Sequence, residues 1–315
     1  MKKILCLVLL LTASVFAASC EPKEKYIEAT FLAMDTEISI KIADDEYDEL
    51  AMIAECEKLV KNIESVVVSN TAIANDDIGL FIDVDPVFAE LIALSITYSD
   101  MTDGFFDITV GGIKELWERC SAEGREPHEG EIALALEAVG YEKISLEDGS
   151  LKKEKNFARI DLSDILKGYA AQKVCDYLSE VGARGAVVSF GENIAFVGSQ
   201  KSGKPYSLGI KDSENESKTV CDILLEGGFV SVACDLDGDI IDPFSGGAYK
   251  SDIRSVYVIS DDGAMAAAFS VALFGMGKDA AMDFYSRNSE LFEAVIITDD
   301  GMLLTDGIKD SVKTK

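Results

Sequence analysis

Positive charge is scarce in this sequence. Over 315 residues it has 29 lysines and arginines against 57 aspartates and glutamates, for a formal net charge of -28. Proteins bind nucleic acids and anionic lipid surfaces through basic patches, so this balance argues against both kinds of partner. Histidine is scarcer still. The single one, His128, stands outside every motif described below and is interpreted as an ordinary surface or loop residue.

Paired cysteines and long apolar runs are also missing. The seven cysteines form no C-x-x-C pair, so the sequence indicates neither a zinc framework nor a disulfide scaffold. We expect most of them to be small buried side chains, with at least one free thiol. The apolar run at residues 4–18 is too short to span a membrane comfortably, and the one at 264–275 is short and ends in glycine.

The first twenty residues predict export. Lys2 and Lys3 precede the apolar run, and small residues then lead to Cys20. This order is typical of a signal peptide, here residues 1–19, and the cysteine directly after it indicates lipidation. Residues 20–27 form a charged tether, so we predict an exported lipoprotein anchored on the periplasmic or cell-surface side of a membrane. The alternative is plain secretion, with an incidental thiol at Cys20.

The rest of the chain is predicted to be a mixed α/β protein. Its hydrophobic content of 48% and charged content of 27% are typical of a folded protein. Periodicity and turn residues predict helices at 46–68, 86–100, 129–139, 167–181, 264–274 and 278–288, and a loop at 69–85. Strands are expected at 27–42, 186–189, 194–197, 206–210, 219–225 and 255–260, with hairpins at 141–158 and 294–305. A connection at 115–130 separates an N-terminal lobe, 28–118, from a C-terminal lobe, 119–315.

Several motifs follow one another along the chain. Residues 160–170 read IDLSDILKGYA, and the others are AMDT at 33–36, DGFFDITV at 103–110, SFGENI at 189–194, DPFSG at 242–246 and AAFSVALFG at 267–275. In order and spacing they resemble the ApbE family, whose corresponding patterns include D-L-G-G-I-A-K-G-Y-A, G-A-F-D-x-T-V, N-L-G-G-N-I, D-P-x-T-G and D-A-L-S-T. The resemblance covers about residues 28–306.

This resemblance implies a fold and an activity. The fold would be a two-lobed ApbE-like α/β arrangement with a flavin cleft between the lobes. The activity would be FAD:protein FMN transfer, in which FMN moves from FAD to a threonine or serine of an exported electron-transfer protein and AMP is released. FAD and Mg²⁺ would be required. The alternative is a catalytically inactive flavin-binding or partner-binding lipoprotein.

The resemblance also implies which residues bind the flavin nucleotide, and leaves the catalytic residue unassigned. The implied cofactor-binding residues are Met34, Thr36, Lys167, Gly168 and Asp242. Each has a plainer interpretation: an ordinary strand for the first two, a surface lysine at a helix start for Lys167, and a turn cap for Asp242. Gly168 would let a ligand approach the backbone closely.

The chain departs from the family pattern where a metal would bind. The family's magnesium ligands would be an aspartate, a threonine and a backbone carbonyl, and these positions are Ala267, Val271 and Leu166 here. Alanine and valine have no side-chain oxygen, and magnesium prefers oxygen ligands. Only the carbonyl of Leu166 remains.

Acidic residues also stand at unexpected positions. The glycines of D-L-G-G are Ser163 and Asp164, and Glu192 adds a negative charge where N-L-G-G-N-I has a glycine. An Asp-x-Asp-x-Asp run at positions 235, 237 and 239 is either a replacement cation loop or, as we favour, an acidic turn. Asp107 and Thr109 are interpreted as buried hydrogen-bonding residues.

Overall fold

The computed structural model describes residues 25–43, 48–76, 81–155, 157–200, 202–212, 215–234 and 240–314. The predicted signal peptide, Cys20 and most of the tether lie outside these residues, as does the acidic run at 235–239. Within the described ranges, none of the helices combines the length and the apolar character needed to cross a membrane.

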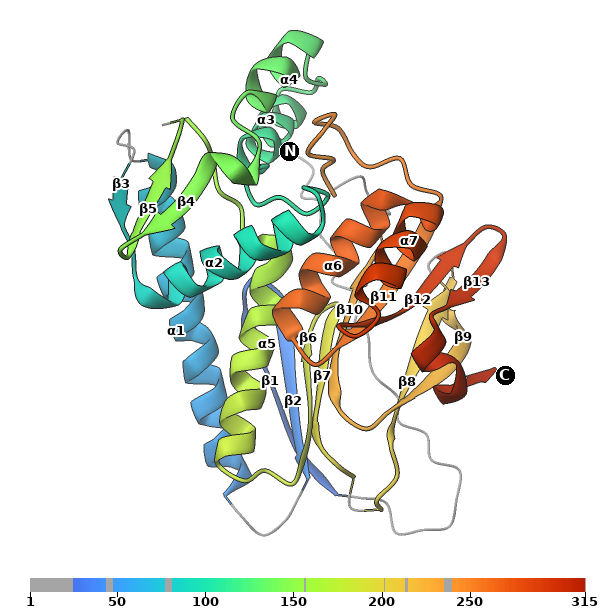
Figure 1. Cartoon of the computed structure of the whole chain (residues 1–315). Helices are drawn as coiled ribbons and strands as arrows, with labels where there is room; N and C mark the ends of the chain where they lie inside the picture. Colours follow the sequence, from blue (N-terminus) through green and yellow to red (C-terminus); the bar gives the residue numbers. More distant parts are fainter. Residues whose placement is uncertain are drawn as a thin grey trace.

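An eight-stranded sheet forms the centre of the molecule (Figure 1). Its strands stand in the order β1–β2–β6–β7–β10–β11–β12–β13, and every neighbouring pair is antiparallel. The strands are β1 (Tyr26–Ala33), β2 (Thr36–Ala43), β6 (Gly185–Phe190), β7 (Asn193–Gly198), β10 (Gly228–Ala233), β11 (Ile253–Ser260), β12 (Glu293–Thr298) and β13 (Gly301–Leu304).

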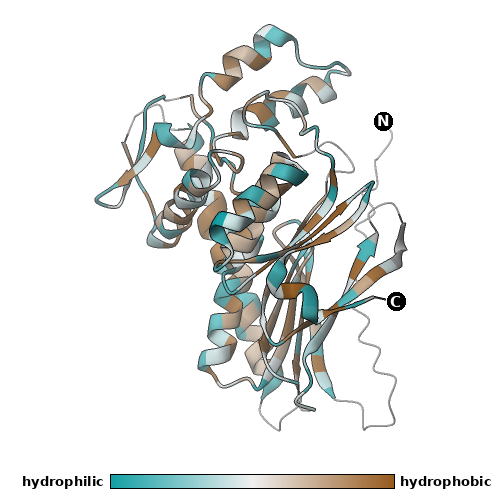
Figure 2. Cartoon of the chain, turned by 45° about the vertical axis from the view of Figure 1, so that its right-hand side comes forward, coloured by the Kyte–Doolittle hydropathy of each residue, from teal (hydrophilic) through white to brown (hydrophobic). Residues whose placement is uncertain are grey.

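Both faces of this sheet are covered by other elements. Successive side chains of a strand point to opposite faces, and apolar side chains stand on both faces here. Helices α1 (Glu49–Asp76), α5 (Ser163–Glu180) and α6 (Gly263–Met276) lie on one face (Figure 1), where they bury Ile38, Ile40 and Val258. A second sheet of β8 (Tyr206–Asp212), β9 (Asn215–Leu225) and β14 (Val312–Thr314) packs on the other face against Tyr257 and Val295. Figure 2 shows the apolar strands between these two layers.

The remaining elements gather at the end of the sheet where α5 begins (Figure 1). They are α2 (Pro86–Met101), α3 (Gly111–Ala122), α4 (Glu129–Leu136), a 3-10 turn (Tyr141–Lys143) and a small sheet of β3 (Phe81–Asp83), β5 (Ser150–Lys153) and β4 (Ile144–Glu147). Helix α7 (Lys278–Asn288) and a second 3-10 turn (Asp306–Ser311) flank the strands β12 and β13.

Most predicted elements are present, but the loop predicted at 69–85 is wrong in its first half. Helix α1 continues to Asp76, and β3 follows at Phe81. The polar residues that suggested a loop satisfy themselves within the helix: the Ser69 hydroxyl donates to the Ser65 carbonyl at 2.7 Å, and the Asn70 amide to the Val66 carbonyl at 2.9 Å.

Four of the five cysteines after position 20 are buried, as predicted for most of them, and all five are free thiols where at least one was expected. Helix α5 begins at Ser163, so Lys167 lies in its second turn and not at its start.

The predicted lobe boundary at 118/119 falls inside α3, and β2 of the N-terminal part pairs with β6 of the C-terminal part. The division into lobes stays a prediction.

Candidate functional site

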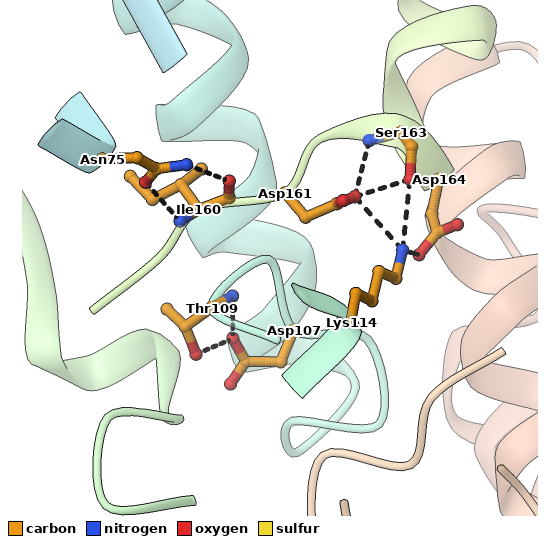
Figure 3. A network of polar contacts seen from close by, with 8 residues as sticks. All are labelled: Asn75, Asp107, Thr109, Lys114, Ile160, Asp161, Ser163 and Asp164. Atoms are coloured by element: carbon orange, nitrogen blue, oxygen red, sulfur yellow. Dashed lines mark hydrogen bonds and ion pairs between the residues drawn. The ribbon is translucent and has the colours of Figure 1, made fainter. Parts of the chain in front are cut away.

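The start of α5 is fixed by side chains from distant parts of the chain. Asn75, near the end of α1, accepts from the backbone N–H of Ile160 at 2.7 Å and donates to its carbonyl at 2.8 Å (Figure 3). The Asp161 carboxylate then accepts from the backbone N–H of Ser163 at 2.9 Å, so it satisfies one of the free N–H groups at the helix start. These contacts turn the chain from strand-like backbone into α5.

A half-buried lysine lies against this helix start. The Lys114 Nζ, from α3, is 3.1 Å from Asp161 Oδ1, from Ser163 Oγ and from Asp164 Oδ2 (Figure 3). Burial disfavours the charged ammonium, but the two carboxylates outweigh this effect and raise the pKa of Lys114 above its usual value. Burial also disfavours the charged form of Asp161 and by itself would raise the pKa of this carboxyl. The charge of Lys114 and the hydrogen bonds from Ser163 outweigh burial, so the pKa of Asp161 is lowered.

Gly168 marks the closest approach of α5 to α6. A Cβ at this position would stand 2.2 Å from the carbonyl oxygen of Gly263 and 2.7 Å from the Cβ of Ala267. The face of Gly168 that lacks a side chain is therefore occupied by α6, which gives this glycine a packing role. Its predicted contact with a ligand stays a prediction. The next residue, Tyr169, is 2% exposed and packs in the core.

The neighbourhood of Ala267 does not fit magnesium. Ala267 is 1% exposed and Val271 is half-buried, and neither side chain has an oxygen. The one hydroxyl between them, on Ser270, is already 3.1 Å from Ser231 Oγ and 2.9 Å from the carbonyl of Ala267. Among the residues that the structure describes, no three His, Cys, Asp or Glu side chains gather as a metal site. The carbonyl of Leu166 alone does not make a magnesium site.

Lys167 lies beside the turn between β6 and β7. Its Nζ is 4.0 Å from Glu192 Oε2, and the two side chains are 27% and 55% exposed. The buried Thr36 lies beside the same turn, because its Oγ1 is 3.1 Å from where a Cβ on Gly191 would stand. The structure thus brings Thr36, Lys167 and Glu192 together.

Met34 belongs to the hairpin between β1 and β2. Met34 and Asp35 have φ of +53° and +55°, the conformation of a tight two-residue turn. The Met34 side chain is 7% exposed and forms part of the core on the helix face of the sheet. This burial matches the plainer interpretation of an ordinary hairpin residue, and its ligand role stays a prediction.

Asp242 organises its own loop. Its carboxylate accepts from the Phe244 N–H at 2.9 Å and from the Ser245 hydroxyl, and its backbone N–H donates to the Gly247 carbonyl at 2.7 Å. The Trp117 indole of α3 donates to the Gly246 carbonyl at 2.7 Å and holds the loop against α3. These contacts match a turn cap, and a contact of Asp242 with a ligand stays a prediction.

Asp107 and Thr109 form a buried hydrogen-bonded pair, as expected. Asp107 Oδ1 accepts from the N–H of Thr109 at 2.7 Å and from its hydroxyl at 2.6 Å (Figure 3), and Oδ2 accepts from the Tyr141 N–H at 2.8 Å. Burial raises the pKa of Asp107 although these hydrogen bonds act against the rise. The pair ties the segment before α3 to the segment after α4.

Three residues that matter here were missed from the sequence: Lys114, Asn75 and Tyr249. The hydroxyl of the half-buried Tyr249 donates to the Phe105 carbonyl at 2.6 Å. Burial, followed by the charges of Asp242, Asp107 and Asp164, raises the pKa of Tyr249. The sequence signal for Lys114 and Tyr249 was their position shortly after the motifs at 103–110 and 242–246. The contacts themselves span at least 47 residues for Lys114 and 85 for Asn75, so no local pattern indicates them.

The site therefore combines two lysines with an excess of carboxylates around the first two turns of α5. Lysine ammonium groups donate hydrogen bonds to phosphate oxygens. The carboxylates of Asp161, Asp164 and Glu192 neutralise both lysines in the structure. The arrangement suits a phosphate-bearing ligand only if that ligand competes with these carboxylates.

A family model described as the ApbE family matches residues 34–296. The chain is 24% identical to the FAD:protein FMN transferase of Haemophilus influenzae, with 96% of each chain covered. It is 27% identical to the protein of the same name from Vibrio cholerae over 66% of each chain.

Solved structures of the same family share the fold. A crystal structure of the ApbE protein of Thermotoga maritima superposes with a TM-score of 0.83 at 25% identity, over 91% of this chain and 99% of that one. The flavin transferase ApbE of Vibrio cholerae superposes with a TM-score of 0.80 at 22% identity, over 92% of this chain and 100% of that one. The predicted family and α/β fold are confirmed.

Proposed function

We propose that this chain, which belongs to the ApbE family, transfers FMN from FAD to a serine or threonine hydroxyl of an acceptor protein. The observation that carries the proposal is the end-to-end match with a FAD:protein FMN transferase. Several of the motifs behind that match also lie close in space. Helix α5 lies beside the turn between β6 and β7, and α3 contacts both the start of α5 and the loop of Asp242. FAD is the substrate in this proposal.

The reaction is a phosphoryl transfer. The acceptor hydroxyl oxygen attacks the phosphorus on the FMN side of the pyrophosphate, a new phosphoester bond forms, and the bond to the bridging oxygen breaks. AMP leaves and the hydroxyl proton is released. Lys114 and Lys167 are the cations placed to bind phosphate oxygens, once their carboxylate partners yield. The family implies Mg²⁺, but Ala267 and Val271 give the ion no ligand, so no step here depends on it.

We further propose that the protein is exported and held at a membrane by lipid on Cys20. The charged start, the apolar residues 4–18 and the small residues before Cys20 support this. The acceptor would then be an exported electron-transfer protein on the same side of the membrane. Mass spectrometry of the mature protein tests the anchor: a diacylated N-terminal cysteine supports it, and an unmodified or uncleaved N-terminus overturns it.

The activity is tested by incubating the purified protein with FAD, Mg²⁺ and an acceptor peptide that carries a threonine or serine. We expect AMP by chromatography and covalent flavin fluorescence on the acceptor after denaturing electrophoresis. Lys167→Met should lower both, whereas Lys58→Met, whose parent side chain is 76% exposed on α1, should not. Neither product from the wild type would refute the transferase. FAD that binds without turnover would instead support the inactive flavin-binding protein, which the loss of oxygen at Ala267 and Val271 favours.

A further inference from the structure

We propose that the carboxylates of Asp164 and Glu192 compete with a ligand's phosphates for Lys114 and Lys167, and so set which flavins the site accepts. The proposal rests on the proposed function, because it concerns the same site and the same substrate. It adds that the chain carries its own anionic competitors. Each lysine has a carboxylate partner that a phosphate must displace.

Lys114 has no free donor. An ammonium group has three N–H bonds, and the three oxygens at 3.1 Å from Asp161, Ser163 and Asp164 use all of them. A phosphate oxygen can bind Lys114 only if one of these oxygens leaves.

Asp164 is the partner that can leave. Asp161 is anchored, because its carboxylate also accepts from the backbone and the hydroxyl of Ser163. The Asp164 carboxylate has Lys114 as its one hydrogen-bond partner among the described residues, and its side chain is 34% exposed. Rotation of Asp164 away from Lys114 therefore costs a single contact and makes one ammonium donor available.

Glu192 is held even more loosely. Its Oε2 lies 4.0 Å from the Lys167 Nζ, beyond hydrogen-bond length, and its side chain is 55% exposed. Within the described part of the chain this ion pair is the only polar side-chain contact of either residue. Glu192 thus neutralises Lys167 by charge alone, which the pyrophosphate of FAD, with one negative charge on each phosphate, does more strongly at shorter range.

Both carboxylates stand where the family patterns D-L-G-G and N-L-G-G-N-I have glycine. Glycine at either position would leave the neighbouring lysine without this competitor. Compared with these patterns, Asp164 adds a negative charge at the start of α5 and Glu192 adds one at the turn between β6 and β7, and the two charges act in the same direction. They weaken the binding of a ligand in proportion to the number of phosphates that it carries.

The test is a comparison of FAD and riboflavin binding by flavin fluorescence, at low salt with a chelator present. Asp164→Asn and Glu192→Gln should each tighten FAD by about three- to tenfold, since one negative charge roughly 7 Å from a phosphate is removed in a partly exposed site. Riboflavin, which has no phosphate, should bind all variants equally. The control is Asp176→Asn, which removes the same charge from an exposed position of α5 and should change nothing.

Each possible result of this comparison either supports or overturns the proposed competition. Equal FAD affinities in the wild type and both variants overturn the competition, and so does a gain for riboflavin as large as that for FAD. Undetectable FAD binding in every variant overturns it too. Release of AMP in the transferase assay is read separately, so unchanged affinities with intact AMP release would leave the proposed function standing. If Asp164→Asn unfolds the helix start, seen as a lowered melting temperature, the exposed Glu192→Gln carries the test.

Discussion

Replacing Gly168 by alanine should separate α5 from α6. The new Cβ would lie 2.2 Å from the Gly263 carbonyl oxygen and 2.7 Å from the Ala267 Cβ. Neither atom can rotate away, because one is backbone and the other is fixed to it. A carbon and an oxygen need more than 3.0 Å, so one helix must move by about 1 Å in a close-packed interior.

The expected cost follows from two opposing effects. Overpacking of a core costs about 1–3 kcal/mol, and contact with two rigid atoms places this site near the upper end. Alanine gains about 1 kcal/mol over glycine in a helix interior, which partly offsets the clash. We therefore expect Gly168→Ala to lower the free energy of unfolding by roughly 2 kcal/mol.

Chemical denaturation followed by circular dichroism measures this change, provided that the denaturant slopes of the variants agree. Gly130→Ala is the matched control, because a Cβ on this glycine of α4 meets nothing within 4 Å. That variant should be unchanged or more stable by up to about 1 kcal/mol. If Gly168→Ala were as stable as the wild type, the close contact between α5 and α6 would be wrong, and with it the packing role given to this glycine.

Three further changes test other parts of the site. Lys114→Met should lower the free energy of unfolding by roughly 1–3 kcal/mol at pH 7, because the partly buried Asp161 and Asp164 lose their cation. This loss of stability should shrink as pH falls through the lowered pKa of Asp161, and a loss that does not depend on pH would contradict the ion pair. Trp117→Phe should cost about 1 kcal/mol, since the Gly246 carbonyl loses its donor; an unchanged denaturation midpoint would count against it. Ala267→Asp with Val271→Thr should lower stability without metal and recover it in Mg²⁺ if oxygen ligands are all that is missing. Calorimetry showing no magnesium binding would mean that the cleft differs in more than these two residues.

The sequence was a good guide wherever local pattern and structure have the same period. Alternating residues such as those of β2 predicted strands, and the helix at 264–274 was predicted from an apolar run that ends in glycine. The end of α1 was misjudged because serine and asparagine favour loops on average. Here their side chains bond back to the carbonyls of the same helix, as Asn70 does to Val66.

The site was predicted less completely than the fold. Lys167 was predicted at the start of its helix and lies in the second turn of α5, and the contact that decides its charge was not visible in the sequence. Lys114 is 50 residues from Asp164, and nothing local to α3 indicates that its ammonium reaches the start of another helix. Long-range ion pairs of this kind depend on the packing of whole elements, which no short pattern encodes.

The contact between Gly168 and Ala267 separates the architecture of this site from its chemistry. Gly168 makes room for the Cβ of the residue at 267, and that atom is the same in alanine as in aspartate. The approach of α5 to α6 therefore does not require a metal ligand at 267, and the fold survives when the oxygen is lost. A shared fold is for this reason weak evidence for magnesium chemistry in this chain. The evidence that would count is electrostatic: with two lysines set against three carboxylates at the start of α5, the site carries net negative charge, and a phosphate ligand must bring its own cation or displace a carboxylate.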